Sequence, residues 1–250
     1  MNELTKINKV AEAGAEAAVD DNSIRPDFIP ADRFTSPDLF RLERECFPRH
    51  AGYLCPDRQR VEAYRRRFSE PGTHLKVGIA WNGGIVHTRR ALRCVPLEEL
   101  ARLMSDTPHL YVSLQHDDDG TDARRLAQLS GAVVRAFPDT LKSTDETAAV
   151  LCALDVVITV CSSVAHLSGA VGARTWVLTP DVAEWRYLRA GTGLPWYPSA
   201  RLFRQARPGA WRPVIDGVAA ELRALAESAG GDACLHQGSR GTAGADETRG

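Results

Sequence analysis

A β-branched run, a short helical pattern and a second apolar run follow one another between Asp155 and Pro180, and together they constrain the fold of this chain most. The run DVVITV, which ends at Val160, is nearly continuous, as in a strand that is buried on both faces. Ser162 and Ser163 follow directly, and serine is a preferred residue at helix N-termini. Apolar residues then recur at helical spacing up to Gly172, and the run TWVLT resembles a second buried strand. This order predicts a crossover helix between two parallel strands.

Such a crossover suggests where a ligand would bind. In open α/β sheets, ligands bind outside the carboxyl ends of the strands. The N-terminus of a crossover helix offers free N–H groups and partial positive charge there, which suits phosphate. A buried crossover with an ordinary serine cap explains the same pattern, so the pattern alone leaves both interpretations open.

The rest of the chain predicts further units of the same kind, in a Rossmann-like α/β domain with a mostly parallel sheet and helices on both faces. Strands are expected at 75–81, 110–114, 132–137 and 201–203, and helices at 57–68, 96–104, 122–129, 144–154 and 211–226. We expect this domain to occupy 71–228, after an irregular and helical extension over 1–70. The segment 229–250 is rich in small and polar residues and is predicted to be a disordered tail.

Composition excludes several classes of protein. The formal net charge is -1, which gives no bulk electrostatic reason to expect binding to nucleic acid or to an anionic membrane. No apolar run approaches the roughly 20 residues of a membrane helix, and the N-terminus has no apolar signal core. The 6 cysteines are scattered, without zinc-ligand spacing, so reduced thiols in the cytoplasm are expected.

Several separated motifs resemble one family. They are WNGG at Trp81–Gly84, RCVPLEELARL at Arg93–Leu103, YVSLQ at Tyr111–Gln115, VCSSVAHLSGAVG at Val160–Gly172, EWRYL, and PWYPSARLFRQ up to Gln205. In order and spacing, from about 75 to 225, the chain resembles the C-terminal nucleotide-sugar domain of the heptosyltransferase-like glycosyltransferases (family 9, GT-B fold). The likeness is greatest to the form that is fused to tetratricopeptide repeats in bacteria, although no such repeat is visible in this sequence.

The resemblance implies a set of residues that bind a nucleotide diphosphate sugar. The loop with Trp81, Asn82 and Gly83, together with Arg93, would hold the diphosphate side, because glycine admits a close ligand and guanidinium groups suit phosphate oxygens. Gln115 would lie near the base and ribose. The last part of the set, Ser162, Ser163 and His166, would face the diphosphate. From the residues alone, a solvated basic loop, a polar strand end and a structural histidine explain these positions nearly as well.

One position departs from the family pattern. The family carries an aspartate that contacts the donor sugar where this chain has Cys161. A thiol cannot accept two sugar hydroxyls as a carboxylate does, so we interpret Cys161 first as a small buried residue and expect sugar binding to be weakened, altered or lost.

Two other functions are less well supported. The triplet Asp117-Asp118-Asp119 follows a strand, as in glycosyltransferases that bind a divalent cation, but a loop that precedes a helix also explains it, and no metal site is predicted. No GxGxxG follows the first strand, which argues against a nicotinamide dehydrogenase.

The sequence therefore predicts a glycosyltransferase-family protein that takes a nucleotide sugar as donor, needs no other cofactor and transfers the sugar to an unknown acceptor, such as a polypeptide or glycan. A non-catalytic, truncated module is the alternative. About seventy residues precede the first strand, without the strand, glycine-rich turn and helix of an acceptor domain. A partner chain is one expected source of the catalytic and acceptor-binding groups that such an acceptor domain would supply.

Overall fold

The computed structural model describes residues 50–83, 90–105, 107–116, 119–137, 141 and 143–237. Most of the predicted extension over 1–70 lies outside these residues, as does the part of the predicted tail at 238–250. Within the described part of the chain, no helix combines the length and the apolar content needed to cross a membrane.

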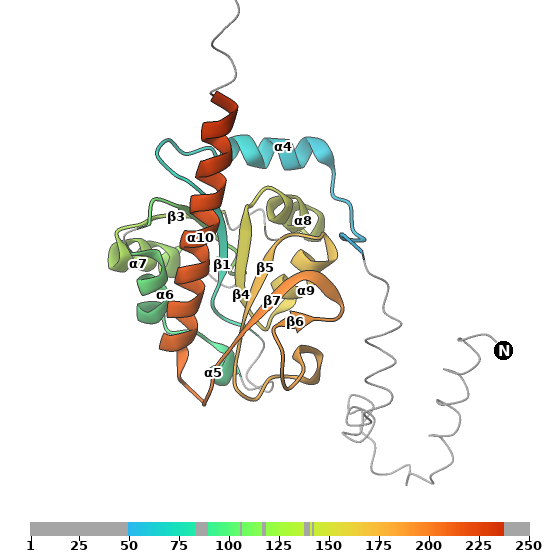
Figure 1. Cartoon of the computed structure of the whole chain (residues 1–250), viewed down its shortest axis with the longest axis vertical. Coiled ribbons are helices and arrows are strands. Elements are labelled where there is room, and N and C mark those ends of the chain that lie inside the picture. Colours follow the sequence, from blue (N-terminus) through green and yellow to red (C-terminus); the bar gives the residue numbers. More distant parts are fainter. Residues whose placement is uncertain are drawn as a thin grey trace, which may run out of the picture. The chain divides into compact units, whose positions relative to one another are not determined.

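A seven-stranded sheet in the order β3-β2-β1-β4-β5-β7-β6 forms the centre of the fold (Figure 1). Its strands are β1 Lys76–Ala80, β2 Leu110–Ser113, β3 Val133–Ala136, β4 Val156–Val160, β5 Thr175–Thr179, β6 Gly193–Leu194 and β7 Tyr197–Arg204. Neighbouring strands pair in parallel from β3 through to β7, and the short β6 alone pairs antiparallel, with β7. The predicted mostly parallel α/β sheet is therefore confirmed.

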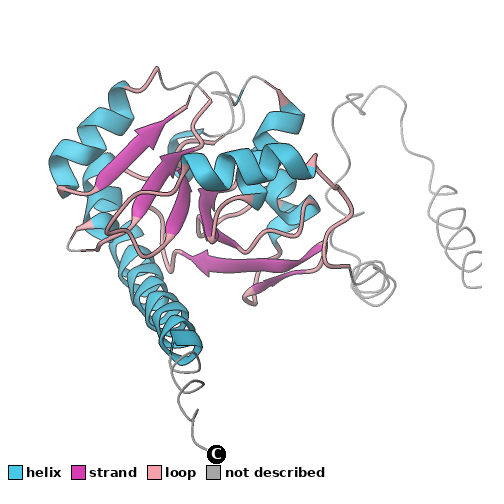
Figure 2. Ribbon diagram, turned by 90° about the horizontal axis from the view of Figure 1, so that it is seen from above, coloured by secondary structure: helices cyan, strands magenta, loops and turns pink. Residues whose placement is uncertain are grey.

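Helices cover both faces of this sheet (Figure 2). They are α4 Arg58–Arg67, α5 Arg90–Arg93, α6 Leu97–Met104, α7 Thr121–Ser130, α8 Thr144–Cys152, α9 Ser163–Ala170, η3 Trp185–Tyr187 and α10 Trp211–Gln237. One apolar cluster joins α6 and α10 to one face of the sheet, through residues such as Ile79, Leu100 and Val218. A second cluster joins α4 and α8 to the other face, through residues such as Phe68, Val112 and Leu151.

Helix α10 and strands β6 and β7 differ most from the prediction, which also lacked the short α5 and η3. Helix α10 continues to Gln237, past the expected end at 226 and into the segment expected to be disordered. Strand β7 begins at Tyr197, before the expected start at Arg201, and pairs with the unpredicted β6. Pairing with β5 and β6 stabilises this longer strand, although the sequence around Pro198 gives little local indication of it.

The crossover helix α9 packs unusually close to β7. A Cβ atom at Gly169 would lie 2.3 Å from Cγ of Tyr197, so only glycine allows this approach of helix to strand. The contact fixes the last turn of α9 against the beginning of β7.

We predict that Gly169→Ala lowers the free energy of unfolding by about 1–3 kcal/mol, because the added methyl group would overlap the Tyr197 ring in a packed interior. Gly217→Ala on α10 is the matched control, since nothing lies within 4 Å of its Cβ, and it should raise stability by about 0.5–1 kcal/mol. Urea unfolding of the two variants measures both effects, and equal stabilities would contradict the packing argument.

Candidate functional site

The chain order of the sheet reverses between β1 and β4, which pair side by side from Val77↔Val156 to Ala80↔Thr159. Loops that leave two such strands turn to opposite faces and open a crevice at their carboxyl ends. The loop after β1 holds Trp81, Asn82 and Gly83, and the segment after β4 holds Cys161 and Ser162. The expected ligand edge of the sheet is therefore built from the two segments that the motifs singled out.

Gln115 fixes the loop after β1 from the end of the neighbouring strand. Its Oε1 atom accepts hydrogen bonds from the backbone N of Asn82 at 3.0 Å and of Trp81 at 3.3 Å, and the residue is buried. The loop also touches the segment after β4, because a Cβ at Gly83 would lie 2.7 Å from the carbonyl O of Cys161 and 3.3 Å from Cβ of Ser162. Any other residue at Gly83 would push the two segments apart.

A pocket of about 180 Å³ lies where these segments meet, and we call it the switch-point pocket. The predicted site residues that line it are Asn82, Gly83, Gln115, Ser162 and Ser163. Two further polar residues, Arg90 on α5 and His116 after β2, complete its polar lining. The structure thus brings five positions from separate motifs together, while their binding of a nucleotide sugar stays a prediction.

The N-terminus of α9 opens into this pocket without a side-chain cap. Ser162 occupies the cap position in an extended conformation, but its side chain makes no capping hydrogen bond. Its Oγ atom lies 3.0 Å from Oγ1 of Thr159 instead. The first N–H groups of a helix have no partner within the helix, so this end offers donors and partial positive charge to a ligand. Together with the guanidinium of Arg90, it favours an anionic group.

Trp81 contributes its backbone to the site and its side chain to the core. The side chain is 1% exposed and packs in the apolar cluster beneath α6 and α10. Among the described residues, its Nε1 atom has no hydrogen-bond partner. The geometry therefore argues against a direct contact between this indole and a nucleotide-sugar donor.

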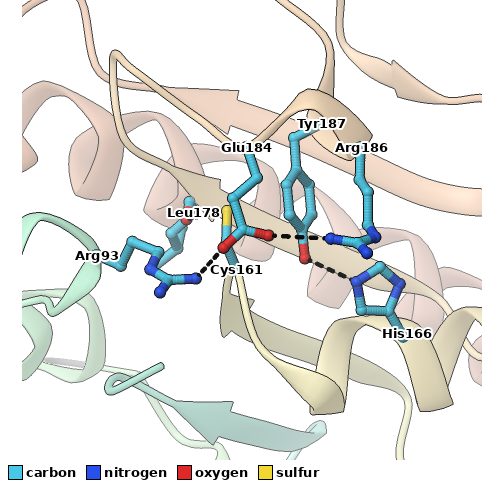
Figure 3. Close-up of polar contacts among 7 residues, drawn as sticks. All are labelled: Arg93, Cys161, His166, Leu178, Glu184, Arg186 and Tyr187. Atoms are coloured by element: carbon cyan, nitrogen blue, oxygen red, sulfur yellow. Dashed lines mark hydrogen bonds and ion pairs between the residues drawn. The ribbon is translucent and has the colours of Figure 1, made fainter. Parts of the chain in front are cut away.

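Cys161, Arg93 and His166 lie beside the segment that follows β5 (Figure 3), and none of the three lines the switch-point pocket. Arg93 is almost fully buried and forms an ion pair with Glu184, whose other carboxylate oxygen lies 3.4 Å from Nη1 of Arg186. Glu184 is the first residue of the motif EWRYL, but sequence reasoning gave it no role, because an acidic residue before a short 3-10 turn gives no local signal of a distant arginine partner. The pairing becomes visible only when the loop after β1 and the segment after β5 meet in space.

Cys161 is 2% exposed and packs with Val177 and Tyr187 in an apolar cluster between α9 and β7. Its Sγ atom lies 4.0 Å from the carbonyl O of Leu178. Burial, with the charge of Glu184 adding to it, raises the pKa of the thiol to about 12. The structure therefore favours the interpretation of Cys161 as a small buried residue.

His166 lies one turn into α9, between two tyrosines. Its Nε2 atom lies 3.3 Å from the hydroxyl of Tyr187, and its ring centroid lies 5.7 Å from that of Tyr197. Burial, followed by the nearby charge of Arg186, lowers its pKa, so the ring is neutral at pH 7. A neutral ring can donate to a phosphate oxygen but does not neutralise its charge, and the predicted phosphate contact of His166 stays a prediction.

The alternative metal site falls largely outside the described residues, since Asp117 and Asp118 are not among them. Oδ1 of Asp119 accepts a hydrogen bond from the backbone N of Thr121 at 3.0 Å, as in an ordinary turn that leads into a helix. No group of three or more metal-ligating side chains occurs within the part of the chain that the structure describes.

We predict that Glu184→Gln lowers the free energy of unfolding by about 1–3 kcal/mol, because it leaves the charge of Arg93 buried with a weaker partner. The loss stays below that of a fully buried pair since the Glu184 side chain is 38% exposed. Glu98→Gln is the matched control, because its pair with Arg125 is 61% and 57% exposed and should matter by less than about 1 kcal/mol. If urea unfolding gave equal losses of unfolding free energy for the two variants, the assignment of Glu184 as the stabilising partner of buried Arg93 would be contradicted.

We also predict that iodoacetamide at pH 8 labels Cys55 and spares Cys161 in the folded protein. Cys55 is exposed, whereas the raised pKa of about 12 keeps the buried Cys161 thiol protonated at this pH. Peptide mass spectrometry after timed alkylation measures the two rates, and unfolding in urea should make Cys161 reactive. Equal labelling rates in the folded protein would contradict the burial of Cys161.

Comparisons with known proteins agree with this fold. No protein-family model matches the chain. It is 30% identical over 205 residues to Protein FlbA of Caulobacter vibrioides, across 81% of this chain and 33% of that protein.

Two solved structures are also similar. The ADP-heptose LPS heptosyltransferase II of E. coli matches with a TM-score of 0.53 and 16% identity, over 70% of this chain and 53% of the other. A family 9 glycosyl transferase of Veillonella parvula matches with a TM-score of 0.52 and 12% identity, over 72% and 55%. The chain thus spans about a third of the curated relative and about half of each solved structure, and it has the fold of the family 9 glycosyltransferases.

Proposed function

We propose that this chain belongs to the family 9 glycosyltransferases and binds a nucleotide diphosphate sugar at the switch-point pocket. One observation carries the proposal: the uncapped N-terminus of α9, the glycine loop after β1 and Arg90 converge on one pocket at the reversal of strand order. This is where open α/β sheets bind ligands, and the converging groups are those that bind phosphate. The fold shared with a heptosyltransferase supports the same conclusion.

The size of the pocket supports a proposal for which part of the donor it holds. A volume of about 180 Å³ is below the 300–1,000 Å³ of typical small-molecule pockets, so it suits the diphosphate and not a whole nucleotide sugar. The N–H groups of α9 and the guanidinium of Arg90 would hold the phosphate oxygens. Gln115 would act by holding the loop after β1 in place, since its Oε1 atom already accepts from that loop. The nucleoside and the sugar would extend beyond the pocket.

The reaction that we propose is transfer of the sugar from this donor to an acceptor, a polypeptide or a glycan, in the bacterial cytoplasm. The solved E. coli relative is described as an ADP-heptose enzyme, so ADP-heptose is the first donor to test here. Transfer requires an acceptor held in line with the anomeric carbon and a general base. We propose that a segment outside 71–228, or a partner chain, supplies these groups.

A non-catalytic binding module is the second candidate, and the burial of Cys161 favours it. Where the resembled family has a carboxylate for the sugar, this chain has a thiol that is 2% exposed and packed among apolar side chains. Such a group offers no hydrogen bonds to sugar hydroxyls. Product analysis of the chain with a bound donor and a mixed acceptor panel separates the candidates, because only the enzyme releases nucleoside diphosphate in proportion to glycosylated product.

We predict that Arg90→Gln weakens binding of a nucleoside diphosphate at least about tenfold, because a hydrogen bond to a charged group is worth about 1.5–3 kcal/mol. Binding of the corresponding nucleoside, which lacks the phosphates, should not change. Isothermal titration calorimetry with both ligands measures the difference. Arg212→Gln is the matched control, since Arg212 is exposed on α10 and does not line the pocket.

Two results would contradict the proposal. One is the absence of binding for every nucleoside diphosphate and nucleotide sugar of a panel, at millimolar concentration. The other is an equal loss of affinity in Arg90→Gln and Arg212→Gln, which would place the diphosphate elsewhere.

A further inference from the structure

A larger groove lies at the amino edge of the sheet, opposite the switch-point pocket. It has a volume of about 880 Å³ and is bounded by His74 in the segment before β1, by the end of α6 with the segment leading into β2, and by α10. The polar residues that matter here are His74, Arg102, His109, Arg223 and Glu227. In Figure 1 this edge lies near the upper part of α10, whereas α5, which follows the loop after β1, lies near the lower end. We call this feature the amino-edge groove.

His109 is the buried polar group of this groove. It is 2% exposed, and its Nδ1 atom has no hydrogen-bond partner among the described residues. Buried polar atoms in native proteins nearly always have a partner. The nearest aromatic residues do not supply one, because the hydroxyl of Tyr111 is 2.8 Å from Oγ1 of Thr107 and the ring centroid of His74 is 6.3 Å away. His109 lines a space large enough to hold a ligand that supplies the missing partner.

The charges around the groove are also poorly satisfied by the protein. Arg223 and Glu227 are one turn apart on α10, a spacing at which opposite charges usually attract, yet neither forms an ion pair with another described residue. The nearest acidic partner of Arg102 is Glu99, with an N–O distance of 3.8 Å. Arg223 therefore borders the groove without an ion pair to another described residue, and Arg102 has only the long contact with Glu99. Guanidinium forks match phosphate and carboxylate oxygens.

We propose that the amino-edge groove binds a small anionic metabolite, with its phosphate or carboxylate on Arg102 and Arg223 and a hydrogen bond to His109. Glu227 borders the same space. A ligand that also carries hydroxyl groups would place its anionic group on the arginines and donate hydrogen bonds from its hydroxyls to the Glu227 carboxylate. A hydroxylated phosphate, such as a sugar monophosphate, has this chemistry. The volume of about 880 Å³ falls within the range of pockets for ligands of this size.

The burial of His109 fits a hydrogen-bonding role and not a charged one. Burial lowers the pKa of its imidazole most. A hydrogen bond with the backbone of Pro108 acts in the opposite direction, while the nearby His74 lowers the pKa further and Asp155 raises it. The ring is therefore neutral at pH 7, and the two arginines carry the charge that holds the anion.

This site is independent of the proposed nucleotide-sugar pocket. The two lie at opposite edges of the sheet and share no lining residue. Loss of one is therefore not expected to abolish binding at the other, and the test can separate them.

The test is a titration of the full chain, labelled with nitrogen-15, with ribose 5-phosphate, inorganic phosphate and citrate, followed by NMR. We expect ribose 5-phosphate to shift the signals of Thr107, His109 and Arg223 with saturation, and the other two probes tell whether a bare phosphate or a carboxylate is enough. Arg223→Gln should weaken this binding at least about tenfold, as for loss of a charge-assisted hydrogen bond. Arg223 is exposed on a helix, so the variant should keep its fold.

Two controls fix the location. Arg212→Gln on the same helix, outside the groove, and Arg90→Gln in the switch-point pocket should both leave the titration unchanged. The proposal is overturned if none of the three probes shifts the groove signals at millimolar concentration. It is equally overturned if Arg223→Gln binds as the wild-type chain does, or if Arg212→Gln loses as much affinity.

Discussion

The pairing of β1 with β4 is the constraint on which the rest of the structure depends. These strands are neighbours in space but are separated along the chain by two other strands, so their carboxyl ends deliver two unrelated segments to one place. Because glycine has no Cβ, the backbone of the first segment at Gly83 can lie against Cys161 and Ser162 of the second segment. Gln115 then ties the first segment to the end of β2. The switch-point pocket is a consequence of these contacts.

The helix that follows β4 divides its polar residues between two surroundings. Ser162 and Ser163, at its N-terminus, line the pocket. His166 lies one turn further along and packs between Tyr187 and Tyr197. A motif in a sequence groups such residues because they are close along the chain, but a helix turns about 100° per residue and distributes them in space. Ser162, Ser163 and His166 therefore need not contact the same ligand group, although they belong to one sequence motif.

The sequence was sufficient for the parts of the fold that depend on local pattern. The β-branched runs of β1, β4 and β5 and the helix between β4 and β5 were predicted within one or two residues, because burial on both faces leaves a continuous apolar signal. The length of β7 and the presence of β6 were not predictable, since pairing with distant strands stabilises them. At the site, the strand ends predicted that Asn82, Gln115 and Ser162 lie at one edge of the sheet, and the three residues line one pocket there, while their binding of a ligand stays a prediction. Glu184 could not be found, because its partner Arg93 is far away in sequence.

Electrostatics explains why Cys161 and Arg93 coexist beside the segment that follows β5. A buried arginine needs an anionic partner, and in this chain Glu184 supplies it from the segment after β5. The thiol of Cys161 remains neutral, because burial and the charge of Glu184 both raise its pKa. A carboxylate at position 161 would place a second negative charge in an apolar cluster beside Glu184, at a high cost in desolvation. The neutral thiol and the Arg93–Glu184 pair are therefore mutually consistent, and a change at either position alters the charge balance of the other.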